Sequence, residues 1–456
     1  MGGHSMSAML AAARRTPRVR FVLVGHADYD NDLGKQMAGA CAARLAGCGV
    51  EAGEVGEAAV TKAAAVAAAR AALRDDPDAV VLFVGTWLEA PVAVAALREV
   101  EHLPVAVWAV PMFDTPEGRE STGSFVGQLV LKGTLRRMGR PACWLTGLPG
   151  DDTTLRAATA FARAAAAVRA LRQTTLGLVG YASMGMYTGT VDPVPLRGVL
   201  GPDLDHLDTY TLVRRAESLP AAEVDAEADR IVACCRVGED VDVDSLRKSA
   251  RLSAALRQLA TERGWQAANV KCQYELSQEY GMTACVAVSM LAQSGIATGC
   301  EGDVPCSVAQ AMLAQFTEEP VWYADVLDFD ADTVLLSPCG FAPPSLAAPG
   351  TQACLGKFTH PGFKGVHVSA QLKPGTVTLA QLCPLHDSFT LLSAVVEGEQ
   401  CALRQGWAPA LRARFANGAK PFLDSLTSQH VALAYGNHAP ELQWLATLLN
   451  LEQAAP

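Results

Sequence analysis

The chain has 456 residues, of which 50% are hydrophobic and 18% are charged, and this composition excludes a disordered protein. Lys and Arg number 37 against 47 Asp and Glu, so the formal net charge is −10. An acidic chain without a basic block argues against a partner that is nucleic acid or an anionic membrane. No apolar stretch approaches the ~20 residues of a membrane-spanning helix. We therefore expect a soluble enzyme that acts on a small molecule.

The N-terminus and the cysteines both favour a cytoplasmic location. Residues 1–16 are interpreted as a tag or disordered segment, because Met1-Gly-Gly-His-Ser-Met6 resembles an expression scar. The basic Arg14 and Arg15 follow an Ala-rich stretch, which is the wrong order for a secretory signal. The 13 cysteines include no Cys-x-x-Cys pair, so reduced thiols are expected.

The first third of the chain alternates strand-length apolar runs with helical periodicity. This alternation predicts a parallel sheet covered on both faces, in a first α/β domain over residues 17–173. The predicted strands are Val19–Val24, Ala79–Val84, Val105–Val110 and Cys143–Leu145.

A second α/β domain is predicted over residues 174–330. Its expected strands include Leu176–Gly180, His206–Val213 and Ala267–Lys271, and its last helix is Ser307–Gln315. After Asp330 helical periodicity fades, and short β-rich runs alternate with Pro and Gly. That change predicts an antiparallel barrel or sandwich over residues 331–456.

Two carboxylates follow strand-like segments in the second domain. Glu301 comes after Ile296–Thr298, and Asp325 comes after Val321–Ala324. One strand–helix–strand crossover between them would place both side chains at the carboxyl ends of adjacent parallel strands, where ligands collect. Such a pair raises a pKa or recruits a cation. The alternative is that both residues merely cap helices.

Several strings resemble the L-fucose isomerase / L-arabinose isomerase superfamily. They lie mainly after residue 80 and are densest over 267–330; the strings are Ser183-Met-Gly-Met-Tyr-Thr-Gly-Thr-Val-Asp192, Lys271-Cys-Gln-Tyr274, Cys285-Val-Ala-Val-Ser289, Cys300-Glu-Gly-Asp-Val304, Gly375-Thr-Val-Thr-Leu379 and Ser428-Gln-His-Val-Ala-Leu-Ala-Tyr-Gly436. The resemblance implies two Rossmann-like α/β domains followed by a C-terminal antiparallel β-barrel domain.

The resemblance also implies a divalent metal, commonly Mn²⁺, bound by Glu301, Asp325 and His430. An Asp at the second position is similar to the fucose branch. His360, His367 and His438 are the alternative histidines, but only His430 precedes the matching Val-Ala-Leu-Ala-Tyr-Gly string. Oxygen ligands with one imidazole suit Mn²⁺, and the metal would stabilise an enediol while the two carboxylates act as acid and base.

The resemblance implies that Trp87 contacts the sugar, with ordinary packing at the rim as the alternative. Gln273 follows the strand Ala267–Lys271 and is a candidate to bond a sugar hydroxyl. Lys271 and Trp407 are further candidates, with a structural role as the alternative for Lys271. The resemblance implies that Trp87 covers the site of a neighbouring subunit, and we therefore expect a homo-oligomer, either a trimer or a hexamer. The segment Ser337–Pro343 is more apolar than in other members, which leaves room for an unusual sugar derivative. Two further interpretations stay open: the same site redirected to epimerisation, elimination or a C–C step, and a sugar-binding protein without catalysis.

Overall fold

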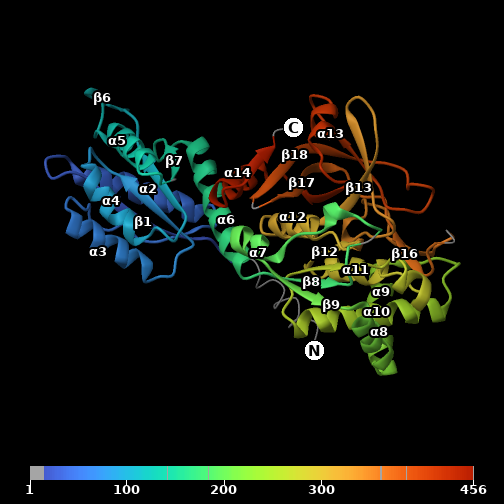
Figure 1. Cartoon of the computed structure of the whole chain (residues 1–456). Coiled ribbons are helices and arrows are strands. Elements are labelled where there is room, and N and C mark those ends of the chain that lie inside the picture. Colours follow the sequence, from blue (N-terminus) through green and yellow to red (C-terminus); the bar gives the residue numbers. More distant parts are fainter. Residues whose placement is uncertain (1–14, 141, 183, 360–361, 387, 455–456) are drawn as a thin grey trace. The chain divides into compact units, whose positions relative to one another are not determined.

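The computed structural model describes residues 15–454 except 141, 183, 360–361 and 387. The predicted tag therefore lies almost wholly outside the described residues. The described chain divides into two compact units, one from Arg15 to Arg169 and one from Ala170 onward. Their elements are labelled in Figure 1.

The N-terminal unit is built on a five-stranded parallel sheet with the strand order β2-β1-β3-β4-β7. The strands are β1 (Arg18–Val24), β2 (Glu51–Ala52), β3 (Ala79–Val84), β4 (Val105–Ala109) and β7 (Cys143–Thr146), with a small hairpin of β5 (Phe113–Thr115) and β6 (Gly118–Glu120). The helices are α2 (Asn31–Gly47), α3 (Lys62–Leu73), α4 (Ala90–Glu99), α5 (Ser124–Arg137) and α6 (Asp152–Arg172). The predicted parallel sheet is confirmed.

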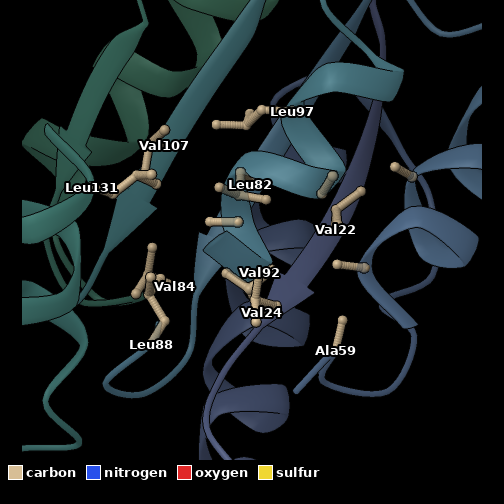
Figure 2. Close-up of a cluster of buried hydrophobic side chains, with 14 of the residues drawn as sticks. Val22, Val24, Ala59, Leu82, Val84, Leu88, Val92, Leu97, Val107 and Leu131 are labelled. Atoms are coloured by element: carbon tan, nitrogen blue, oxygen red, sulfur yellow. The ribbon is translucent and has the colours of Figure 1, made fainter. Parts of the chain in front are cut away.

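The core of this unit explains why its strands are apolar without alternation. Every residue of β3 is buried, because both faces of a parallel sheet are covered by helices. On one face, Leu82 and Val84 of β3 pack with Val22 of β1 and with Val92 and Leu97 of α4 (Figure 2).

The unit that begins at Ala170 contains a second parallel sheet, with the order β12-β11-β8-β9. Its strands are β8 (Thr175–Val179), β9 (Asp203–Leu207), β11 (Ala267–Val270) and β12 (Ala297–Cys300). Its main helices are α8 (Thr209–Ser218), α9 (Ala221–Cys234), α10 (Val243–Glu262), α11 (Cys285–Gln293) and α12 (Val304–Ala314), with a short α7 (Pro193–Pro195).

A mainly antiparallel sheet follows in the same unit, in the order β17-β20-β13-β14-β19-β18-β21. A further pairing of β17 with β18 brings the order back to its start. The strands are β13 (Trp322–Phe329), β14 (Thr333–Ser337), β17 (Gly375–Leu385), β18 (Ser388–Gln400), β19 (Leu411–Arg414), β20 (His430–Tyr435) and β21 (Glu452–Ala454). A smaller sheet joins β10 (Arg236–Val237), β15 (Cys354–Lys357) and β16 (Val366–Ser369), and helices α13 (Lys420–Ser425) and α14 (Ala439–Leu448) complete the unit. The antiparallel sheet is confirmed; its description as a barrel stays a prediction.

Helix α12 joins the two sheets of this unit. It packs against β11 and β12 of the parallel sheet and against β17 and β20 of the antiparallel sheet (Figure 1). All of its residues from Val304 to Leu313 are buried, as expected for a helix that is apolar on every side. The N-terminus of α12 is therefore a fixed point between the sheets.

Two predictions of local structure were wrong. The predicted strand over His206–Val213 ends at Leu207, because the Asp208 carboxylate caps helix α8 by accepting from the Thr211 N–H. The expected pair of parallel strands before Glu301 and Asp325 does not form either, since β12 and β13 belong to different sheets. The boundaries at residues 173 and 330 stay predictions. Among the described residues, no helix is long and apolar enough to cross a membrane.

Candidate active site

Glu301 lies on a sharp turn directly after β12. Its backbone has φ of +69°, which is uncommon for a residue with a side chain, and Gly302 follows with φ of +75°. A Cβ atom at position 302 would lie 2.2 Å from the Tyr181 carbonyl oxygen, so only glycine fits there. Strained backbone of this kind clusters at functional sites. The turn leaves the Glu301 side chain 6% exposed at the edge of the parallel sheet.

Asp325 and His430 face each other on the antiparallel sheet. They are direct partners in the register of β13 with β20, so their side chains share one face. Asp325 Oδ1 lies 3.2 Å from His430 Nε2, and Glu301 Oε2 lies 3.6 Å from the same nitrogen. The three residues predicted from the sequence thus come together. Asp325 reaches the cluster from within a strand, not from a strand end as predicted.

Asp303 holds the other side of the His430 ring. His430 Nδ1 donates to Asp303 Oδ2 at 2.7 Å, while Asp303 Oδ1 accepts from the Cys306 N–H and caps α12. Gln381 Nε2 also donates to the His430 carbonyl oxygen at 2.7 Å. Because Asp303 accepts the hydrogen bond from Nδ1, Nε2 is the nitrogen presented to Glu301 and Asp325. Sequence reasoning missed this role, since an Asp two residues before Pro305 signals only a helix cap.

His430 Nε2 also contacts the Tyr323 hydroxyl at 2.6 Å. Burial opposes protonation of His430, but hydrogen bonds to Asp303, Asp325 and Glu301 outweigh it and raise its pKa well above the usual range. Burial, then the charges of Glu301 and Asp325, raise the pKa of Tyr323. A proton on Nε2 therefore supplies positive charge between the two carboxylates.

Whether these residues fit a divalent cation can be judged from their donor atoms. Two carboxylates and one imidazole form an N/O donor set of the kind that binds Mn²⁺. In the described part of the chain, however, no three His, Cys, Asp or Glu side chains stand in an arrangement ready to hold a metal. A physical reason is visible at Nε2, which would have to lose its proton and its contact with the Tyr323 hydroxyl before it could coordinate a cation. The donor chemistry fits, and the arrangement requires that local change.

The wall around the cluster is apolar, as the sequence predicts. Phe341 is 2% exposed and its ring centroid lies 6.3 Å from that of Tyr323. Cys339 Sγ lies 3.5 Å from Glu301 Oε1, and burial together with the Glu301 charge raises the pKa of the Cys339 thiol. Glu301 thus has one side against a neutral thiol and the other toward His430.

Lys271 and Gln273 follow β11, the strand next to β12. Val270 is the register partner of Cys300, so Lys271 and Glu301 leave the sheet from adjacent strands. The Lys271 side chain is fully buried; its ammonium bonds the Glu275 carboxylate and the Tyr181 hydroxyl. Gln273 is 3% exposed. Contact of either residue with substrate stays a prediction.

The remaining candidates lie outside this cluster. Trp407 is half-buried, with its ring centroid 4.7 Å from that of His367. His367 is buried, not outward-facing, and burial lowers its pKa to about 4. His438 Nε2 contacts the Tyr435 carbonyl oxygen at 2.9 Å. His360 is outside the described residues. Trp87 belongs to the N-terminal unit, where its backbone N–H donates to the Thr122 carbonyl oxygen. Its contact with substrate stays a prediction.

Comparison with known proteins points to sugar isomerases. No protein-family model matches the chain. A sulfoquinovose isomerase of Priestia aryabhattai is 25% identical over 358 residues, covering 76% of this chain and 79% of that protein. A sulfoquinovose isomerase of Alkalicoccus urumqiensis is 24% identical over 390 residues, covering 82% and 85%. A solute-binding protein of Agrobacterium vitis bound to α-D-tagatopyranose matches with 15% identity and a TM-score of 0.16, which carries no argument.

These relatives support the predicted enzyme class, an isomerase. They are consistent with a sugar isomerase superfamily, whereas the fucose branch stays a prediction.

Proposed function

We propose that the chain is a divalent-metal-dependent aldose–ketose isomerase whose substrate is sulfoquinovose, a glucose derivative with a sulfonate on C6. The names of the relatives support the substrate and the reaction. The observation that carries the proposal is the convergence of Glu301 and Asp325 on His430 Nε2, within 3.6 and 3.2 Å. Paired carboxylates beside an imidazole suit both proton transfer and a cation.

The reaction needs two proton transfers and no redox partner. One carboxylate removes the C2 proton of the open-chain aldose, the C2–H electron pair forms the C1=C2 bond, and the C1 carbonyl oxygen gains a proton. The O2 hydroxyl then loses its proton as the C2 carbonyl forms, and C1 accepts a proton from the carboxyl group. A cation held by Glu301, Asp325 and His430, most suitably Mn²⁺, would stabilise the negative charge that develops on the enediol oxygens.

The surroundings of Glu301 and Asp325 serve this chemistry. The Phe341 and Tyr323 rings exclude water from one side, which protects an enediol from side reactions. Asp303 keeps the His430 ring in a single orientation, with Nε2 toward the two carboxylates. Glu301 and Asp325 come from different sheets, and can therefore act from different directions on the substrate.

The assembly and the finer fold belong to the same proposal. We infer a fucose-isomerase-like subunit with a C-terminal β-barrel, a cytoplasmic location and a cyclic homo-oligomer. In that assembly Trp87 of one subunit covers the site of its neighbour. Trp87→Ala should then reduce turnover while leaving metal affinity unchanged, and light scattering should report a multiple of 47.9 kDa. A fully active monomer would contradict this part.

Product NMR tests the central claim. Sulfoquinovose incubated with the Mn²⁺-loaded protein should yield its 2-ketose, with exchange of one carbon-bound proton in D₂O or internal transfer between C2 and C1. EDTA treatment should stop conversion, and Mn²⁺ should restore it. An epimer or an elimination product would instead favour a redirected reaction, and binding without conversion would favour a sugar-binding protein.

A further inference from the structure

We propose that Arg404 binds the sulfonate of the substrate and thereby sets the specificity of the site. This inference rests on the proposed function and assigns a residue that sequence reasoning did not single out. Arg404 lies in a tight turn before β19, where the Arg404 and Ala408 backbones exchange two hydrogen bonds of 3.0 and 2.9 Å. That turn fixes the backbone position from which the Arg404 side chain extends.

A row of residues across the antiparallel sheet connects Arg404 with the cluster at Glu301. His430 on β20 pairs with Asp325 on β13, and Asp325 pairs with Ser337 on β14. Direct partners share one face, so these three side chains form a line across adjacent strands. Arg404 Nε donates to Ser337 Oγ at 2.9 Å and extends that line by one position.

The spacing of the row matches the length of a hexose. Neighbouring strands lie about 4.8 Å apart, so the Arg404 guanidinium is roughly 5–8 Å beyond Asp325. An extended six-carbon chain spans about 6 Å from C1 to C6, with C–C bonds of about 1.5 Å. A sugar whose C1 and C2 lie at Glu301 and Asp325 can therefore bring its C6 group to Arg404.

The contacts of Arg404 orient its charge without cancelling it. Besides Ser337, the guanidinium donates to the Pro338 carbonyl oxygen at 3.2 Å and to Gln405 Oε1 at 3.1 Å. All three acceptors are neutral, and no described carboxylate forms an ion pair with Arg404. The Trp407 ring centroid lies 5.5 Å from Arg404 Cζ and covers one side of the cation.

Three other cations of this unit already have a carboxylate partner. Arg412 bonds Asp330, Lys373 bonds Glu319, and the buried Lys271 bonds Glu275. A sulfonate is a fixed monoanion with three oxygen acceptors, and a guanidinium can bind two of them side by side. Arg404 is thus a half-buried cation, bonded to Ser337 of the row, whose charge is available to a substrate anion.

The experiment compares two substrates that differ only at C6. Sulfoquinovose carries the sulfonate, whereas 6-deoxyglucose has hydrogen in its place. We expect Arg404→Gln to lower kcat/KM for sulfoquinovose about 10- to 100-fold, mostly through KM, because hydrogen bonds to a charged group are lost. The kcat/KM for 6-deoxyglucose should change less than threefold. Arg404→Lys should restore part of the loss, since it returns the charge but not the paired geometry.

Matched controls separate this effect from misfolding. Arg412→Gln removes an arginine of the neighbouring strand β19 that is already paired with Asp330, and should leave both substrates unaffected. Mn²⁺ affinity and thermal unfolding of each variant establish that the cluster and the fold persist.

Calorimetric titration with both sugars distinguishes the inference from the proposed function. If the wild type converts sulfoquinovose and Arg404→Gln binds and converts it equally well, the inference is overturned and the proposed function stands. If the wild type binds sulfoquinovose through Arg404 but isomerises neither sugar, the inference stands and the proposed function fails. Equal wild-type binding of the two sugars would overturn the role of Arg404 whatever the reaction.

Discussion

The carboxylates of the candidate site are held in two different ways. Glu301 depends on the backbone, because two consecutive left-handed residues turn the chain out of β12. Asp325 depends on register, because pairing with His430 and Ser337 fixes it inside an antiparallel sheet. The turn at Glu301 concentrates backbone strain in two residues. The sheet instead holds Asp325 in place with many ladder hydrogen bonds. We therefore expect a single substitution to disrupt the turn at Glu301 more readily than the sheet around Asp325.

The largest expected effect is on activity, from Glu301→Gln. The amide keeps the shape of the side chain but cannot act as a base, so kcat should fall by roughly 10²- to 10⁴-fold. Thermal unfolding should change little, since Gln also fits the turn. Asp325→Asn should give a loss of similar size, although it stands on the other sheet. Retention of near wild-type kcat in either variant would remove that carboxylate from the chemistry.

The strained turn itself is tested by Gly302→Ala. The new Cβ would meet the Tyr181 carbonyl oxygen at 2.2 Å in a left-handed backbone, so we expect roughly 2–5 kcal/mol less free energy of unfolding. Gly264 is a matched control: its φ is +64°, but a Cβ there meets nothing within 4 Å. Gly264→Ala should therefore cost only about 1–2 kcal/mol. Equal losses in urea titrations would show that the Tyr181 contact adds nothing.

These two carboxylates also show how far the sequence could go. Glu301, Asp325 and His430 were predicted to lie together, and they do, because the family strings fixed which residues to join. The strand pairing that brings Asp325 to the site was predicted wrongly. An apolar run such as Val321–Ala324 does not reveal whether its strand pairs in a parallel or an antiparallel way. Asp303 and Arg404 were not predicted because their roles depend on contacts with residues far away in the sequence. His430 is 127 residues from Asp303, and Ser337 is 67 residues from Arg404.

Asp303 follows the turn at Glu301 and bonds the His430 ring of the antiparallel sheet, so its replacement affects both arrangements. Asp303→Asn keeps an oxygen to cap α12 but removes the charge that orients His430. We expect Mn²⁺ affinity to fall about 10- to 100-fold by calorimetric titration, with little change in thermal unfolding. Asp242→Asn, at the cap of α10, provides the control because it alters a cap away from the cluster. Unchanged Mn²⁺ affinity in Asp303→Asn would show that backbone and sheet register alone place the ring.

The smallest expected effect concerns His367, whose ring packs against Phe358 and Trp407. Burial lowers its pKa to about 4, from an ordinary value near 6.5, so the folded protein resists its protonation. Between those values the unfolded chain binds more protons, and stability is therefore lost as the pH falls from about 7 towards 4. At pH 5 this loss should amount to about 2 kcal/mol relative to pH 8.

His367→Gln should remove that share of the pH dependence in urea titrations, whereas replacing the exposed His206 by Gln should not. Because each variant replaces one histidine alone, the difference between the curves isolates the contribution of His367. Parallel curves for wild type and His367→Gln would show that this ring becomes protonated as readily in the folded protein as in the unfolded chain.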